Sequence, residues 1–156
     1  MNARVWIPAA ADTDGNVILA AKAERSGRFT CLKCGEEMWL RRGSRRQPHF
    51  AHKKASADCL AEDVLWVAVM QVILRHLDRI VFELSDGGGL VCFAKATCVD
   101  QQFLVCETES VVVHLHISTS LRRRSPAECY RIDAADVLQA FAVWQSNSYM
   151  KLAAVR

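Results

Sequence analysis

The chain has 156 residues, of which 51% are apolar and 24% are charged, a composition that supports a folded core and excludes intrinsic disorder and fibrous repeats. The uncharged stretches 64–74 and 137–150 are shorter than the ~20 apolar residues that span a bilayer, so we expect no membrane partner. No apolar signal segment follows Met1, which predicts a cytoplasmic protein.

Positive charge is concentrated near the first cysteines. The net charge is +3 overall, but residues 22–54 contain ten Lys and Arg against three acidic residues, a local net charge of +7. The rest of the chain has ten basic and fourteen acidic residues, a net charge of −4. A local excess of this size attracts polyanions.

The N-terminal part predicts a β-rich module over residues 1–59. Apolar segments 3–9 and 16–21 flank the turn-forming residues 12–16, a pattern typical of a β-hairpin. A strand is expected over 37–41, and a shorter strand over 47–52 would return toward the cysteines.

The following residues 60–156 predict an α+β domain of a helix, four to five strands and a second helix. The first helix is expected over 60–80, with Asp58 as its N-cap, and its apolar residues 64–74 should pack against a sheet. Because no Pro, Gly or Ser linker follows Cys59, we expect the whole chain to pack as one compact unit.

Strands are expected where β-branched and aromatic residues gather, and they would form an antiparallel meander. The predicted ranges are 81–84, 90–98, 103–107 and 111–118. After the basic loop 121–126 and a short strand near Tyr130, Asp133 would cap a helix that ends at about Ser146.

A metal site is indicated by the spacing of Cys31 and Cys34, because two thiolates separated by two residues can face one ion from a tight turn. Gly35 permits the positive φ that such a turn uses. His52 and Cys59 would complete a Cys₃His set that holds one structural Zn²⁺. His49 is an alternative to His52, since either histidine could reach the turn. The predicted class is therefore α+β: a β-rich zinc-knuckle module, a helix, an antiparallel β-meander and a C-terminal helix.

Several motifs occur in a fixed order: residues 16–23, FTCLKCG at 29–35, residues 38–43, PHFAHK at 48–53, and Cys59. Together they resemble the N-terminal zinc-finger region of the competence protein CoiA-like family, over about a third of the chain. The resemblance implies a zinc-bearing module that in the family precedes a nuclease-like domain of the restriction-endonuclease type, linked to DNA processing and natural transformation.

The residues for such a nuclease are incomplete. This chemistry needs an Asp and a Glu to hold Mg²⁺, and usually a Lys two residues after the Glu. The comparable strand has Glu107 with Glu109 in place of the Lys, and Asp100 is the nearest upstream acid. The sequence therefore predicts no catalytic residues and disfavours an enzyme.

Six cations surround the predicted knuckle and form a candidate binding surface: Arg41, Arg42, Arg45, Arg46, Lys53 and Lys54. Arginine binds phosphate through paired donors, and exposed aromatic residues can stack on unpaired bases. We expect the neighbouring Phe29, Trp39 and Phe50 to form a miniature core instead. The partner is predicted to be nucleic acid or an acidic protein. With a protein partner, the module would act as an inhibitor or adaptor. No small-molecule substrate is indicated.

Overall fold

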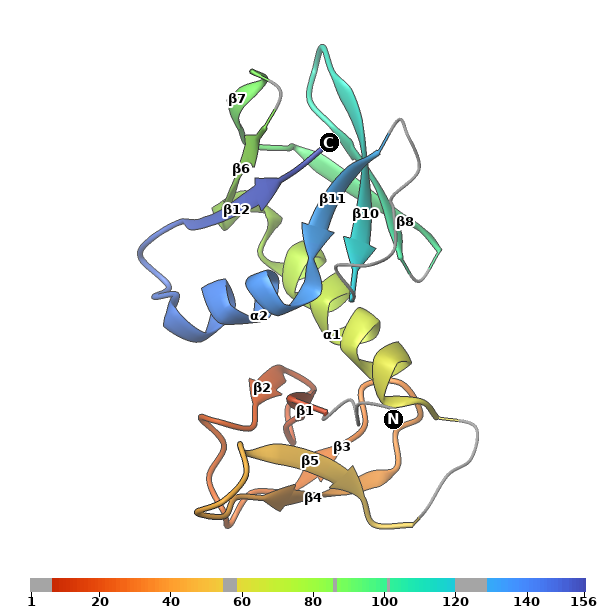
Figure 1. The fold of residues 1–156 in the computed structure, drawn as a ribbon, viewed down its shortest axis with the longest axis vertical. Coiled ribbons are helices and arrows are strands. Elements are labelled where there is room, and N and C mark those ends of the chain that lie inside the picture. The colour runs from red at the N-terminus through yellow and green to blue at the C-terminus, as the bar shows by residue number, and fades with distance from the viewer. Residues whose placement is uncertain (1–6, 55–58, 86, 101, 120–128) are drawn as a thin grey trace. The chain divides into compact units, whose positions relative to one another are not determined.

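The computed structural model describes residues 7–54, 59–85, 87–100, 102–119 and 129–156. The chain divides into two units, Met1–Ala68 and Val69–Arg156. The N-terminal unit holds a five-stranded sheet, and the C-terminal unit holds a four-stranded and a three-stranded sheet (Figure 1). The predicted cap Asp58, the start of the predicted strand 3–9 and the basic loop 121–126 lie outside the described residues. Packing of the chain as one unit stays a prediction.

The N-terminal sheet is antiparallel, in the order β2-β1-β3-β4-β5. Its strands are β1 (Ala9–Ala11), β2 (Val17–Leu19), β3 (Phe29–Thr30), β4 (Glu37–Arg41) and β5 (His49–His52). The predicted hairpin is confirmed as β1 and β2, with Ala9 opposite Leu19. The Asp12 carboxylate accepts hydrogen bonds from the amides of Asp14 and Asn16 at 2.9 Å each, which fixes the turn between the two strands.

The two faces of β4 differ. Met38 and Leu40 point toward the small core, where Phe29 and Phe50 are buried with their ring centroids 5.0 Å apart. Trp39 lies on the opposite face and is 53% exposed. The prediction of a miniature aromatic core is therefore right for the two phenylalanines and wrong for Trp39, because successive strand residues point to opposite faces.

The long helix α1 covers Ala61–Arg75 and ends before the predicted residue 80. A short 3₁₀ turn, η1 (Leu77–Arg79), follows it, and Ile80 already begins strand β6 (Ile80–Leu84). Ile80 pairs with Met150 of β12 (Met150–Ala154) in a parallel ladder. This long-range pairing overrides the helix-forming composition of the segment.

The C-terminal strands form two sheets rather than one meander. β8 (Lys95–Asp100), β9 (Phe103–Glu107) and β10 (Val112–Ser118) are antiparallel neighbours, as predicted, and β11 (Tyr130–Asp133) pairs in parallel with β10. The other sheet has the order β12-β6-β7, with β7 at Gly89–Val91. The predicted strand 90–98 is wrong as one element, because its two ends belong to different sheets.

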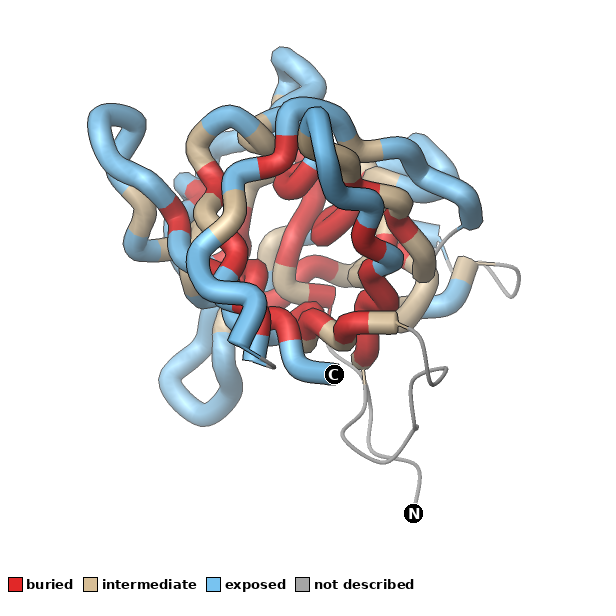
Figure 2. The backbone as a smooth tube through the Cα atoms, turned by 90° about the horizontal axis from the view of Figure 1, so that it is seen from above, coloured by how far each residue is buried: buried red, intermediate tan, exposed pale blue. Residues whose placement is uncertain are grey.

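Large aliphatic side chains fill the core of the C-terminal unit, and buried segments are red in Figure 2. The fully buried set includes Ile80, Phe82, Leu104, Leu115, Ile117, Ile132 and Leu152. Helix α2 (Ala134–Val143) begins at the predicted cap, where the Asp133 carboxylate accepts a 3.0 Å hydrogen bond from the Ala135 amide. It ends at Val143, earlier than predicted. None of the helices described has the length and apolar character needed to cross a bilayer.

Candidate metal centre

The turn between β3 and β4 presents two cysteines. The Cys31 carbonyl accepts a hydrogen bond from the Gly35 amide at 2.9 Å, and the Cys31 amide donates to the Glu36 carbonyl at 2.8 Å. Gly35 has a φ of +76°, a conformation that costs a residue with a side chain more than it costs glycine. The turn is therefore closed by backbone bonds that bring Cys31 and Cys34 to one side, as the spacing predicts.

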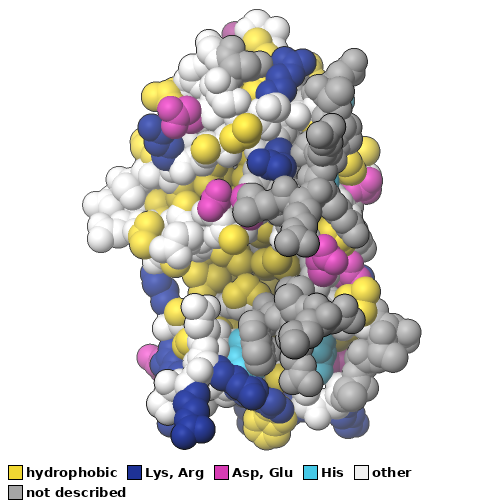
Figure 3. Space-filling view, in the orientation of Figure 1, with side chains coloured by type: hydrophobic (Ala, Val, Ile, Leu, Met, Phe, Trp, Pro, Cys, Tyr) yellow, Lys and Arg dark blue, Asp and Glu magenta, His cyan; other side chains and the backbone are white. Residues whose placement is uncertain are grey.

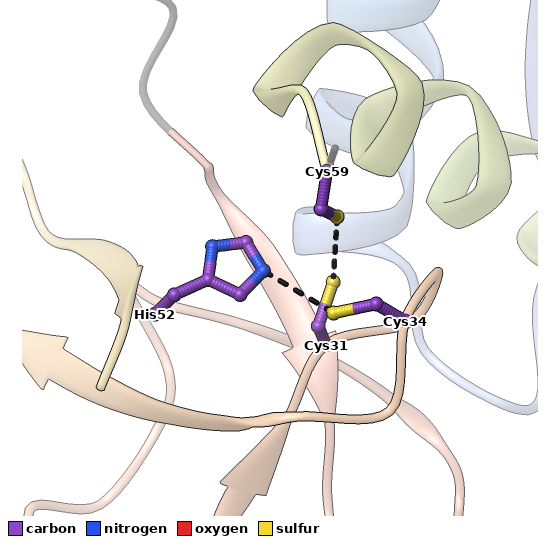
Figure 4. Close-up of side chains that lie close together, drawn as sticks. All are labelled: Cys31, Cys34, His52 and Cys59. Carbon is purple, nitrogen blue, oxygen red and sulfur yellow. Dashed lines mark hydrogen bonds between the residues drawn. The ribbon is translucent and has the colours of Figure 1, made fainter. Parts of the chain in front are cut away.

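Two further side chains reach this turn from separate elements. His52 is the last residue of β5, and Cys59 lies just before α1 (Figure 4). The Sγ atoms of Cys31 and Cys59 are 3.6 Å apart, and Cys34 Sγ is 3.5 Å from His52 Nε2. All four ligand atoms lie within 4.8 Å of one another. The structure thus brings together the four residues selected from the sequence.

This geometry suits a tetrahedral metal ion. Zinc–sulfur bonds of about 2.3 Å place neighbouring sulfurs of a tetrahedron about 3.8 Å apart. The 3.6 Å separation between Cys31 and Cys59 is close to that value. Three thiolates and one imidazole are a donor set typical of structural zinc. The cluster could hold one metal ion, and its donor chemistry favours zinc.

His49 does not join the cluster. It lies three residues before His52 on β5, so the alternation of a strand turns it to the other face. His49 is buried, and its Nδ1 is 3.0 Å from the Gln47 carbonyl oxygen. Of the two histidines considered as ligands, the structure therefore groups His52 with the cysteines.

The thiols of the cluster differ in acidity. Burial, followed by the neighbouring Cys31 and Cys34, raises the pKa of the Cys59 thiol to about 12. Burial also acts to raise the pKa of Cys34, but hydrogen bonds with the Glu36 backbone and with the other two thiols outweigh it and lower that pKa. Three thiolates this close repel one another, so a divalent cation is what would let all three ionise together.

An ion pair links the knuckle to the start of α1. Lys33, between the two cysteines, has its Nζ 2.9 Å from Asp63 Oδ2 in the first helical turn. The hydrogen bond with Asp63 is the main cause of the raised pKa of Lys33. Cys59 and Asp63 thus tie the same helix end to the same turn.

The six cationic side chains of the predicted binding surface lie in different environments. The Arg42 guanidinium donates to the carbonyls of Ala20 and Ala21, at 3.0 and 2.7 Å, so it is part of the scaffold. The loop between β4 and β5 forms an arginine hollow of about 440 Å³, lined by Arg41, Arg42, Arg45, Arg46 and His49. Lys53 and Lys54 are exposed beyond β5. Basic side chains gather over the part of the chain that holds β4 and β5 (Figure 3).

The residues considered for a nuclease do not form a comparable cluster. Glu107 Oε2 is 4.0 Å from Lys95 Nζ on the neighbouring strand, and the Asp100 carboxylate accepts a hydrogen bond from the Gln102 amide. Within the described ranges, the Cys₃His cluster is the only group of three or more His, Cys, Asp or Glu side chains that could hold a metal ion.

Trp39 is the functional candidate that sequence reasoning misplaced. The signal was available in the sequence, because Glu37, Trp39 and Arg41 alternate with the apolar Met38 and Leu40. Charged residues on both sides at a period of two mark the solvent face of a strand.

Comparisons with known proteins bear on the N-terminal part of the chain. No curated protein matches it, and no solved structure matches it. A family model does match, and the matched segment includes all four side chains of the metal cluster. The resemblance indicated by the motifs is confirmed: residues 14–62 are related to the family described as competence protein CoiA, N-terminal domain.

Proposed function

We propose that the N-terminal unit is a zinc-stabilised module that binds nucleic acid, with the metal in a structural role. The binding surface would be the outer face of β4 and β5, which is the face that carries Trp39 and Arg41. With three cysteines and one histidine as ligands, a tetrahedral ion has no open position for a substrate or an activated water. The role of the metal centre is therefore structural: it would hold the turn, strand β5 and the start of α1 together.

The observation that carries the binding function is the arginine hollow. Arg41, Arg45 and Arg46 are exposed and line one depression in the loop that the metal-stabilised sheet supports. Guanidinium groups bind phosphate oxygens through paired donors, and three of them in one hollow suit a polyanion. Arg42 is assigned to the scaffold, since its bonds to the Ala20 and Ala21 carbonyls connect two loops.

The test is binding of a labelled DNA duplex by fluorescence anisotropy at several salt concentrations, with the full zinc-loaded chain. Binding should weaken with salt, because each phosphate contact releases about 0.9 counterion from duplex DNA. Changing Arg41, Arg45 and Arg46 to Ala together should remove most binding and lower the salt slope by about 2 to 3.

A matched control removes three exposed cations from the C-terminal unit instead: Arg75→Ala, Lys95→Ala and Lys151→Ala. This variant has the same net charge as the hollow variant and should bind almost normally. Equal loss in both would show a net-charge effect only and contradict the proposed site. If the purified chain instead carries one stoichiometric acidic protein and no nucleic acid, the function as a protein-docking adaptor replaces this proposal.

A further inference from the structure

A second hollow adjoins the outer face of β4, on the side of the strand toward β3. This tryptophan groove has a volume of about 520 Å³, and its lining includes Arg25, Arg28, Thr30, Glu37, Trp39 and Lys53. Trp39 and Arg41 lie two residues apart on β4, so both project from the same face. The groove and the arginine hollow therefore border one face of the same strand.

Core packing does not explain the position of Trp39. The core uses Phe29 and Phe50, while the indole is 53% exposed. Directly opposite Trp39 on β5 is Ala51, whose methyl group is too small to cover the ring. A large aromatic surface is thus held in solvent on a rigid strand, which is how base-stacking residues are presented in single-strand binding proteins.

Lys53 holds the indole from one side. Its ammonium lies 4.2 Å from the centroid of the Trp39 ring, and it is fixed there by a 2.8 Å ion pair with Glu37. The Lys53 amide also donates to the Glu37 carbonyl at 3.0 Å. The cation restrains the ring, and more than half of the residue's surface still remains open to a ligand.

The acidic residues of the groove are already engaged. Glu37 pairs with Lys53, and the Asp12 carboxylate accepts hydrogen bonds from two amides of its own turn. Arg28 is exposed on the groove, and Arg25 Nη2 is 3.4 Å from the Arg42 carbonyl oxygen. The groove therefore combines an accessible aromatic ring with cations, and both of its carboxylates have partners within the protein.

From these contacts we infer that the outer face selects single-stranded nucleic acid, with an unpaired base stacked on Trp39 and the adjoining phosphates held by arginines of the groove and of the arginine hollow. This inference rests on the proposed function and adds the form of the ligand. The bases of a duplex are stacked on each other and cannot cover an indole, whereas those of a single strand can. Duplex DNA would engage the arginines alone.

The experiment compares three probes on the zinc-loaded full chain: oligothymidylate, an abasic strand of the same length, and a duplex of that length. The unchanged protein should bind oligothymidylate about 5- to 160-fold more tightly than the abasic strand, the range expected for one stacked base. Trp39→Ala should remove this difference and leave duplex binding unchanged, and Trp39→Phe should restore part of it. Oligouridylate in place of oligothymidylate shows whether RNA serves equally well.

Tyr149→Ala is the matched control, since Tyr149 is an aromatic residue of the C-terminal unit with a similar exposed fraction, 59%. It should bind all probes normally, and zinc content should be equal in all variants. A Trp39→Ala variant that keeps its preference for oligothymidylate, or that loses duplex and single-strand binding equally, would overturn the inference. If binding in that case still depends on Arg41, Arg45 and Arg46, the proposed function stands without the single-strand inference. If binding depends neither on Trp39 nor on these arginines, both the proposed function and the inference fail.

Discussion

The two units of the chain differ in the interactions that can stabilise each of them. Among the largest side chains that are fully buried within the described residues, Phe50 and Val64 belong to the N-terminal unit. The strands of that unit are two to five residues long. The C-terminal unit buries most of them, among them Phe82, Leu104 and Leu115.

This difference indicates two sources of stability. Small modules that bury few large side chains commonly depend on a metal, and structural zinc contributes an apparent ~10 to 16 kcal/mol in such peptides. A unit that fully buries many large side chains gains its free energy of folding from apolar burial. The following changes should separate the two sources, beginning with the largest effect.

Loss of one thiolate should unfold the N-terminal unit. We expect Cys34→Ser to abolish zinc binding and to remove the protection of residues 16–54 from hydrogen exchange, because the metal would contribute more than the small core. Residues 103–118 should stay protected. The control is Cys92→Ser, an exposed cysteine of the C-terminal unit. Full zinc content in Cys34→Ser would show that Cys34 is not needed to hold the metal.

Acidification should release the metal. Each thiol must lose a proton to bind, so every pH unit below the ordinary thiol pKa weakens zinc binding about tenfold per thiolate, and up to about a thousandfold for three. Competition with a coloured chelator at pH 7 and pH 8 measures this slope. Affinity must rise with pH, and a flat profile would exclude thiolate ligands.

The C-terminal unit should show no such dependence in that range. Burial raises the pKa of its Cys106 to about 12. Since the pKa in the unfolded chain is also above 8, this thiol is mostly protonated in both states between pH 7 and pH 8. Its contribution to stability is therefore fully present there and would be lost only as the pH rises further toward 12.

Truncation of the apolar core should act on the C-terminal unit alone. Leu115 on β10 is fully buried, and Leu115→Ala should lower the free energy of unfolding by about 2 to 5 kcal/mol through the cavity it leaves. Chemical denaturation followed by hydrogen exchange measures the loss, and zinc content should not change. Leu90→Ala, at an exposed leucine of the same unit, should cost less than about 0.5 kcal/mol. Zinc loss in Leu115→Ala would mean that the two sources of stability are not separate.

Removal of a helix cap should have the smallest effect. Asp133→Ala deletes the acceptor of the Ala135 amide and should cost about 1 kcal/mol in the C-terminal unit. Asp133→Asn keeps an acceptor oxygen and should retain most of the stability. Thermal unfolding distinguishes the two variants, and equal melting temperatures would show that the cap is not required.

The metal cluster was predictable because short sequence patterns mark each of its four residues. Cys31 and Cys34 are two residues apart with a glycine after them, and His52 and Cys59 end or precede elements with clear sequence patterns. The choice between His49 and His52 needed the register of β5, since only the strand alternation decides which ring reaches the turn. Helix α2 was also predictable at its start, where Asp133 is a strong cap.

The C-terminal topology was not predictable in the same way. β12 pairs with β6, a strand seventy residues earlier, and the residues near Met150 do not indicate which strand is its partner. The alternation of burial along β12, with Met150, Leu152 and Ala154 inward, is present in the sequence but is weak because two of its five residues are alanine. Between β7 and β8, Phe93 is buried with its ring centroid 5.2 Å from that of Phe82, a long-range contact that the local pattern of residues 90–98 does not predict.

The spacing of the four ligand residues also makes their contributions to chain entropy unequal. Cys31 and Cys34 are held in one turn by hydrogen bonds between neighbours, whereas His52 must arrive across a loop of about twenty residues, and closing a longer loop costs more chain entropy. Cys31 and Cys34 would therefore need the least ordering of the chain to hold an ion together. His52 at the end of β5 and Cys59 before α1 would complete the set of ligands at a greater cost in chain entropy.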